Sequence, residues 1–206
     1  KQGAKRSSID PCYPSKLGTA HVHDLLFGLG KRKPLDVIFF PMINSLESHL
    51  HNTLGSCACP TVTCTPEVVK AAFTKEQDIF AQKNLRYLDP IIDVHDPAYF
   101  EQQMFDTFAE VLQLDRRENK LAVNAGYQAL RTFKQQMRTR GAAVLRQIVD
   151  QDQIAIVLLA RPYHNDPGIN HGIPEQLQAL GYPVLTADSL PLEQETLEQV
   201  FAEDIE

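Results

Sequence analysis

Seven consecutive apolar residues, 154–160, form the longest uninterrupted hydrophobic run in the chain. The run is far shorter than the roughly 20 residues that span a bilayer, but it fits a strand buried on both faces of a parallel sheet. A polar loop follows at 161–172, then a helix expected over 174–180 and ended by Gly181, then a strand over 183–186. This succession predicts a βαβ unit and therefore an α/β fold with a parallel sheet.

The start of the chain is expected to form another α/β portion. Apolar residues at helical spacing predict a helix over 15–29, with Pro14 in its first turn and Gly30 just past its end. A buried strand is expected over 36–40. The stretch 42–63 has weak periodicity and is expected to be an ordered loop with one short element.

Helix-start signals organise the middle of the chain. Thr65 as N-cap and Pro66 in the first turn predict a helix over 67–73 that resumes over 75–82. Asp96 and Pro97 open a helix to residue 114, and Asp115 with Glu118 forms a capping box for a long helix to residue 150, with Gly141 as a candidate break. We therefore expect Rossmann-like parallel-sheet lobes joined by a helical segment, with these parts: a first α/β portion (1–75), a helical segment (76–150) and the start of a second α/β portion (151–206).

Composition excludes several classes of protein. Of 206 residues, 43% are hydrophobic and 22% charged, which are values of a globular chain. The net charge of −6 argues against a nucleic-acid-binding surface, which needs clustered Lys and Arg. The opening residues lead into no apolar segment of a signal peptide, and residues 198–206 read as a helix cut in mid-course. We expect a piece of a longer cytoplasmic protein with no nucleic-acid or membrane partner.

All four cysteines, Cys12, Cys57, Cys59 and Cys64, lie in the first third of the chain. They are too few for a disulfide scaffold, so they are buried structural thiols, metal or cluster ligands, or redox thiols. Cys12 and Cys64 each stand just before an expected helix start, where free N–H groups and the helix dipole stabilise a thiolate by about 0.3–1 kcal/mol. Spacing alone favours structural thiols and ligands equally.

Other cysteine chemistries are less favoured. The spacing of Cys57, Cys59 and Cys64 is not that of a zinc ribbon, although His49 and His51 could complete a zinc site. His21 and His23 lie two apart on a helix and point to different sides, so they cannot chelate together; we expect one of them to face the cleft.

The loop 161–172 is the other place that can carry chemistry. It leaves the carboxyl end of a strand and leads into a helix, which is where open α/β sheets bind ligands. Its polar groups line a cleft and bind a ligand, or they hydrogen-bond one another to stiffen an irregular turn. The Gly-rich phosphate-binding spacings are absent, which disfavours a simple nucleotide site.

Two motifs carry a resemblance to a known family. Cys12-Tyr13-Pro14-Ser15-Lys16-Leu17, the strand ending Phe39-Phe40-Pro41, and Cys59-Pro60 resemble the Cys-Tyr-Pro-x-Lys and Cys-Pro pattern of proteins related to 2-hydroxyacyl-CoA dehydratases. More specifically, with the loop 161–172, they resemble the uncharacterised domain of large CoA-substrate-specific enzyme activase proteins. The resemblance covers about residues 8–188 and is weak in the helical middle.

The resemblance implies a [4Fe-4S] cluster held between lobes by cysteines from different loops. It points to Cys12 and Cys59 as ligands, with Cys57 and Cys64 as further candidates that depart from the family pattern. A third family cysteine lies downstream of Glu206, so this chain alone can lack the cluster. It also implies a cleft or ligand-binding role for these residues: Arg161, Tyr163, His164, Asp166, Asn170, His171, Lys16 and His21.

The implied function is low-potential electron transfer toward a 2-hydroxyacyl-CoA-type dehydration. The implied partners are an ATPase activase domain or subunit and an acyl-CoA substrate, because this chain lacks the acidic-Gly phosphate motif of the ATPase half. A substrate-binding or docking module with inert thiols is the alternative, and a hydrolase or transferase with His164 or His171 as base is a third hypothesis.

Overall fold

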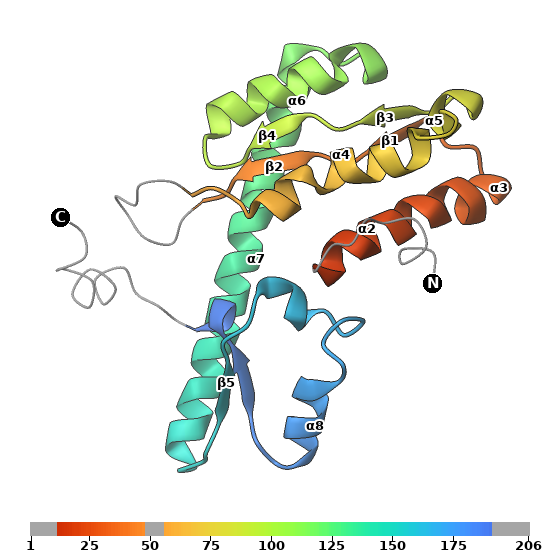
Figure 1. The fold of residues 1–206 in the computed structure, drawn as a ribbon. Coiled ribbons are helices and arrows are strands. Elements are labelled where there is room, and N and C mark those ends of the chain that lie inside the picture. Colours follow the sequence, from red (N-terminus) through yellow and green to blue (C-terminus); the bar gives the residue numbers. More distant parts are fainter. Residues whose placement is uncertain (1–11, 48–55, 191–206) are drawn as a thin grey trace. The chain divides into compact units, whose positions relative to one another are not determined.

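The computed structural model describes residues 12–47 and 56–190, and the chain divides into two compact units, residues 1–123 and 124–206. Each unit contains its own short parallel strands with helices beside them (Figure 1). The fold is therefore α/β, as the sequence predicts. No helix of the described residues is long and apolar enough to cross a membrane.

In unit 1, residues 1–123, the described segments contain four parallel-paired strands. Strand β1 (Val37–Phe39) pairs with β3 (Arg86–Leu88), and β2 (Met42–Ser45) pairs with β4 (Ile91–Asp93). Backbone bonds from Phe40 to Leu88 and from Met42 to Pro90, both 2.8 Å, continue the pairing between them. Strand β2 lies in the stretch 42–63, where one short element was expected, whereas β3 and β4 lie inside the segment expected to be helical.

Two helical stretches cover one face of these strands. The first is α2 (Tyr13–Asp24), a π-helical turn η1 (Leu25–Leu29) and α3 (Gly30–Arg32); the second is α4 (Pro60–Thr74) followed by α5 (Ile79–Gln82). The buried core between them and the strands consists of Val22, Leu26, Ile38, Val69, Phe73, Phe80 and Leu85. This core holds α2 and α4 against each other beside the sheet.

The boundaries of both helical stretches differ from the prediction. Gly30 does not end the first stretch, because its φ of −63° is helical and the chain coils on to Arg32. The second begins at Pro60 with Cys59 as N-cap, so the prediction of Thr65 as N-cap is wrong. Thr65 instead lies inside α4, where its hydroxyl donates to the Thr61 carbonyl and is buried.

The two following helices agree with their capping signals. Asp96 accepts hydrogen bonds from the first amides of α6 (Pro97–Leu112). Before α7 (Arg116–Asp150), the Glu118 N–H donates to Asp115 and the Asp115 N–H donates to Glu118, which confirms the capping box. Gly141 does not break α7.

Unit 2, residues 124–206, contains the predicted βαβ succession. Strand β5 (Ile156–Leu158) leads through a 3₁₀ turn η2 (Pro162–Asn165) and α8 (Ile173–Ala179) to β6 (Val184–Thr186), with a final turn η3 (Ala187–Ser189). The two strands pair in parallel. Burial of the apolar run on both faces is a wrong prediction: Ile154 is 76% and Leu159 84% exposed, since β5 has a single strand partner among the described residues.

Candidate functional site

Cys12 and Cys59 occupy equivalent positions at the starts of two neighbouring parallel helices. Cys12 is the N-cap of α2 and Cys59 the N-cap of α4, and each is followed by a proline in the first helical positions. The helices run in the same direction with their first turns on the same side (Figure 1). The Thr65 hydroxyl of α4 and the Ser15 hydroxyl of α2 are hydrogen-bonded, with 3.2 Å between their oxygens, which joins the two helices near their starts.

The contacts of Thr65 set the relative level of the two cysteines. Besides Ser15, Thr65 packs against Gly18, where a Cβ would lie 3.2 Å from its methyl group. Cys12 precedes these two α2 residues by three to six positions, so it lies level with residues 59–62 of α4. Because packed helix axes lie about 8–10 Å apart, Cys12 and Cys59 belong to one region of the surface.

That region is the carboxyl edge of β2. Cys57 pairs with Ser45, the last residue of β2, in an antiparallel bridge. The Leu46 N–H donates to Ser56 over 3.0 Å and the Ala58 N–H donates to Asn44 over 2.8 Å. The segment that leads to Cys59 is therefore anchored to the end of a strand.

The other predictions about the cysteines have different outcomes. Cys64 does not precede a helix start, because α4 begins four residues earlier, and its side chain is exposed. Cys57 and Cys59 are also exposed, Cys12 is half-buried, and none of the four forms a disulfide. The zinc alternative with His49 and His51 concerns residues outside the described ranges.

The side chains available as metal ligands can be compared with those that the implied [4Fe-4S] cluster requires. A [4Fe-4S] cluster takes four thiolates. Within residues 12–47 and 56–190, no group of three or more His, Cys, Asp or Glu side chains is arranged to hold a metal ion. The structure therefore fits a part of a ligand set, namely two thiols at adjacent helix starts, and other ligands would have to come from elsewhere.

A hydrogen-bonded pair that sequence reasoning missed lies at the same edge. The buried Ser45 hydroxyl donates to Asp93, the last residue of β4, and the His95 N–H donates to the same carboxylate over 3.0 Å. The Ser45 hydrogen bond lowers the pKa of Asp93 below its ordinary value, with the backbone N–H groups acting in the same direction. No motif could reveal this pair, because its members are 48 positions apart.

Acid is expected to weaken unit 1 partly through Asp93. A carboxyl group whose pKa is lower in the folded chain stabilises the fold above its unfolded-state pKa, and this contribution is lost as pH falls through the folded-state value. Urea unfolding from pH 7 down to pH 3 should show a smaller loss of stability in Asp93→Asn than in the wild type. Equal pH slopes in the two proteins would contradict this account.

Lys16 and His21, expected to face a cleft, both lie on α2. Lys16 is half-buried in the first turn, directly after the Cys12 N-cap, and His21 is exposed two turns in. His23 stacks on Phe27 with ring centroids 4.9 Å apart. Lys16 is thus placed near Cys12, whereas the cleft role of His21 stays a prediction.

In unit 2, the loop 161–172 is an ordered turn that begins three residues after the end of β5. Asp166 accepts from the Gly168 N–H over 2.7 Å, and the buried Asn170 accepts from the Gly172 N–H over 2.8 Å. The His164 Nδ1 lies 3.3 Å from the Arg161 carbonyl. Asp166 and Asn170 thus support the loop itself, while Arg161, His164 and His171 are exposed.

Elsewhere in unit 1, an ion pair joins α4 to the strands. Lys70 donates to both oxygens of Asp89, at 2.9 and 3.1 Å, and this hydrogen bonding raises the pKa of Lys70. The adjacent Tyr87 hydroxyl donates to the Pro66 carbonyl over 2.8 Å, and burial raises the pKa of Tyr87. These groups satisfy one another, so they serve the packing of α4 on β3.

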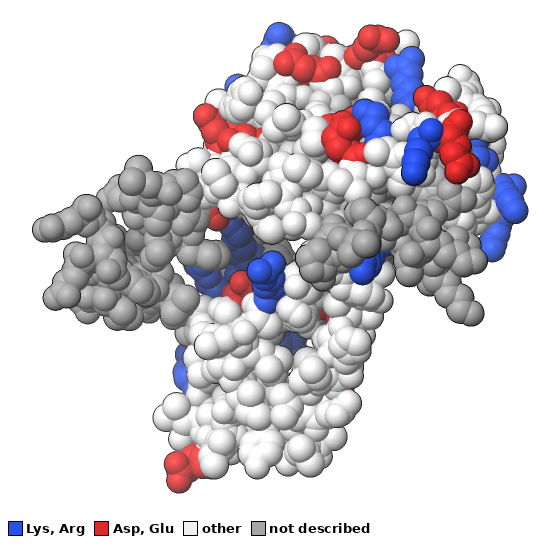
Figure 2. Space-filling view, in the orientation of Figure 1, with Lys and Arg blue, Asp and Glu red and all other residues white. Residues whose placement is uncertain are grey.

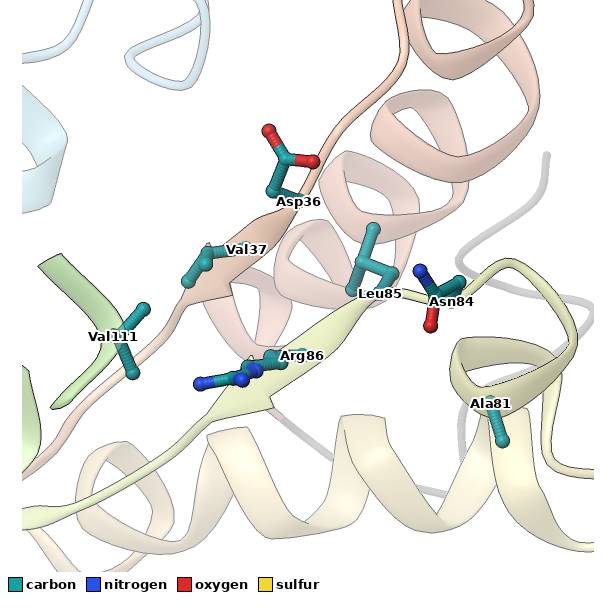
Figure 3. Close-up of a pocket in the computed structure, with 7 residues that line it drawn as sticks. All are labelled: Asp36, Val37, Ala81, Asn84, Leu85, Arg86 and Val111. Atoms are coloured by element: carbon teal, nitrogen blue, oxygen red, sulfur yellow. The ribbon is translucent and has the colours of Figure 1, made fainter.

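An open hollow of about 510 Å³ lies at the amino ends of β1 and β3 (Figure 3). Arg86 and Val37 come from the strands, and Val111 faces them from α6. Arg86 lies 3.8 Å from Glu110, whose side chain is 92% exposed, so the ion pair adds little. The hollow is at the strand ends opposite to the cysteines and shares no residue with them.

Charge on unit 1 is mixed. Figure 2 shows acidic and basic side chains interspersed on the visible face of this unit. Such a mixture gives that face little net field to attract a polyanion.

Comparison with known proteins adds one match. A family model described as the CoA enzyme activase uncharacterised domain covers residues 1–190. No curated protein and no solved structure matches the chain.

Proposed function

Because the chain belongs to the CoA enzyme activase uncharacterised domain family, we propose that it is the dehydratase-like part of such an enzyme system. In this proposal, Cys12 and Cys59 are two thiolate ligands of a [4Fe-4S] cluster that serves low-potential electron transfer toward a 2-hydroxyacyl-CoA-type dehydration. The observation that supports it is the placement of both cysteines as N-caps of adjacent parallel helices.

The local physics of the two helix starts suits this role. The first amides of a helix and its dipole favour negative charge, so they stabilise the thiolate that binds iron. When bound, a [4Fe-4S] cluster supplies one-electron chemistry at low potential. The chain's own part is to hold two sulfur atoms at one edge of the sheet, on a segment that Ser45 and Asp93 help to fix.

The proposal requires partners. Further thiolates come from another polypeptide segment or subunit. An ATPase activase domain or subunit provides the low-potential electron through ATP-driven activation. An acyl-CoA is the substrate class, and the cytoplasm is the expected location. Cys57, two residues before Cys59 at the same edge, is the candidate for a further ligand.

Anaerobic reconstitution with iron and sulfide, in the natural protein that contains this sequence, tests the proposal. We expect broad iron–sulfur absorption that is lost in Cys12→Ser and in Cys59→Ser, because each removes a ligand. The matched control is Cys64→Ser, on the exposed side of α4, which should keep the absorption. A wild type that gains no absorption, or single variants that retain all of it, would refute the cluster.

The alternative is a substrate-binding or docking module with inert thiols. It is favoured by one observation, that no three-ligand group exists among the residues the structure describes. It predicts no stoichiometric iron by elemental analysis after reconstitution. The two functions are thus separated by the same preparation.

A further inference from the structure

Helix α7 concentrates positive charge in an otherwise acidic chain. Between Glu118 and Asp150 its sequence contains no acidic residue, although the chain as a whole has a net charge of −6. The basic residues of this stretch are Lys120, Arg131, Lys134, Arg138, Arg140 and Arg146. Like charges three or four positions apart on a helix repel one another, so this part of α7 favours a partner that carries carboxylates.

Three of these basic residues form a row within unit 2, which we call the basic row. Arg131, Lys134 and Arg138 are spaced by three and four positions, so they follow one another along one side of the helix. Arg131 is exposed, and Lys134 and Arg138 are half-buried. Arg131 donates to the Gln128 side chain over 2.9 Å, but a neutral amide does not offset its charge.

An apolar stripe runs beside the basic row. Leu130 and Phe133 each stand one position before a cation of the row, and their side chains are 38% and 57% exposed. Large apolar side chains of this kind lose contact with water when a partner covers them. The partner that fits this face therefore presents carboxylates next to apolar side chains.

The sequence of residues 191–206 has this composition. It contains no Lys or Arg and six acidic residues: Glu193, Glu195, Glu198, Glu203, Asp204 and Glu206. Its larger apolar residues include Leu197, Val200, Phe201 and Ile205, which recur at helical spacing. Both the charge and the apolar pattern of this segment are thus complementary to the face of α7.

The point where this segment leaves unit 2 lies close to the basic row. The Ser189 carbonyl of η3 lies against Gly141 of α7 and leaves no room for a Cβ there. Gly141 comes ten positions after Arg131, which corresponds to about 15 Å of helix. Sixteen residues span up to about 50 Å, so the segment can reach the whole row, and its attachment makes the encounter intramolecular.

We propose that the acidic segment 191–206 docks on the face of α7 formed by the basic row and its apolar stripe. Carboxylates of the segment pair with Arg131, Lys134 and Arg138, and its apolar side chains cover Leu130 and Phe133. The occupant of this interaction surface is therefore a segment of the same chain. The docking uses no cysteine, so it can fail or succeed independently of the proposed cluster.

Carbodiimide coupling in the natural protein that contains this sequence tests the docking. The reagent joins a carboxylate to a lysine amine in contact with it, and Lys134 is the lysine of the basic row. Peptide mass spectrometry should find Lys134 linked to residues 191–206 of the same chain, which a mixture of unlabelled and ¹⁵N-labelled protein distinguishes from links between chains. The yield should fall about threefold or more in about 1 M salt, where charges are screened within about 3 Å.

Two charge reversals on α7 form a matched pair. Arg131→Glu should lower the yield of the Lys134 link about threefold or more, because it places a negative charge in the basic row. Arg140→Glu should leave the yield unchanged, since Arg140 is also exposed but stands nine positions later, on the opposite side of the helix. Circular dichroism checks the folding of both variants, and the salt series needs no substitution.

The docking would be overturned by the absence of a link between Lys134 and residues 191–206, by a yield that salt leaves unchanged, or by equal yields in the two folded variants. Links between labelled and unlabelled chains would mean that a second copy occupies the row. A link from Lys134 to a different acidic protein would mean that a separate partner does. Either of these results would also overturn the proposal.

Discussion

Replacing Gly141 by alanine should destabilise unit 2 by about 3 kcal/mol, because overpacking against a fixed backbone typically costs 1–3 kcal/mol and sometimes more. Gly141 is buried in α7, and an added Cβ would lie 1.8 Å from the Ser189 carbonyl oxygen and 2.8 Å from its carbon. The neighbour is backbone rather than the end of a flexible side chain, so it cannot simply turn away. Urea unfolding followed by far-UV circular dichroism measures the effect.

The same helix offers a matched control for this prediction. Gly126 also lies in α7, and a Cβ built there meets nothing within 4 Å. Gly126→Ala should therefore stabilise the chain by about 0.5–1 kcal/mol, since alanine loses less backbone entropy in a helix. Two glycine-to-alanine changes on one helix are expected to act in opposite directions. A tolerated Gly141→Ala would mean that η3 does not pack on α7.

The role of Gly141 illustrates what local sequence can and cannot show. A glycine inside a helical pattern suggests a break, yet here it marks the close approach of a segment almost 50 positions later. By contrast, the starts of α6 and α7 were predictable because Asp96 and the Asp115–Glu118 pair act within a few residues. Capping residues lie within a few positions of the helix start that they stabilise, so the sequence reveals them. Packing contacts join residues far apart in the sequence, so a local pattern does not reveal them.

The strands show the same limit. Strands β2, β3 and β4 are three or four residues long, and prolines at positions 41 and 90 stand between the two pairs of strands. A segment this short is not long enough to show the alternation of apolar and polar residues that identifies a strand. Their existence depends on partners about 50 positions away, such as Val37 with Arg86. The βαβ unit of unit 2 was predictable because turn signals and an apolar run bound each element.

The candidate site was predictable in its parts but not in its arrangement. Two Cys- or Thr-Pro signals, at Pro60 and Pro66, compete as starts of α4, and the sequence pattern favours the later one. The helix starts at the earlier proline, Pro60. This start places Thr65 inside α4, where it contacts Ser15 and Gly18 of α2. The result moves Cys59 from a loop to a helix N-cap and moves Cys64 into the helix.

The second large effect concerns the proximity of Cys12 and Cys59. Thr65 sets Cys12 level with residues 59–62, and the axes of packed helices are about 8–10 Å apart. A short bifunctional thiol reagent should therefore join the two side chains in one chain. With Cys57 and Cys64 replaced by serine, Cys12 and Cys59 are the remaining thiols, so that each product can be assigned.

The measurement is peptide mass spectrometry of this two-cysteine chain after reaction with a short bismaleimide, in the native state and in concentrated urea. If both thiols converge at the carboxyl edge of β2, the native protein gives mainly the Cys12–Cys59 cross-linked peptide. The yield of this peptide then falls when the protein is denatured in urea. If each native thiol instead takes up a separate reagent molecule, the two helix starts do not form a shared site and the account is wrong.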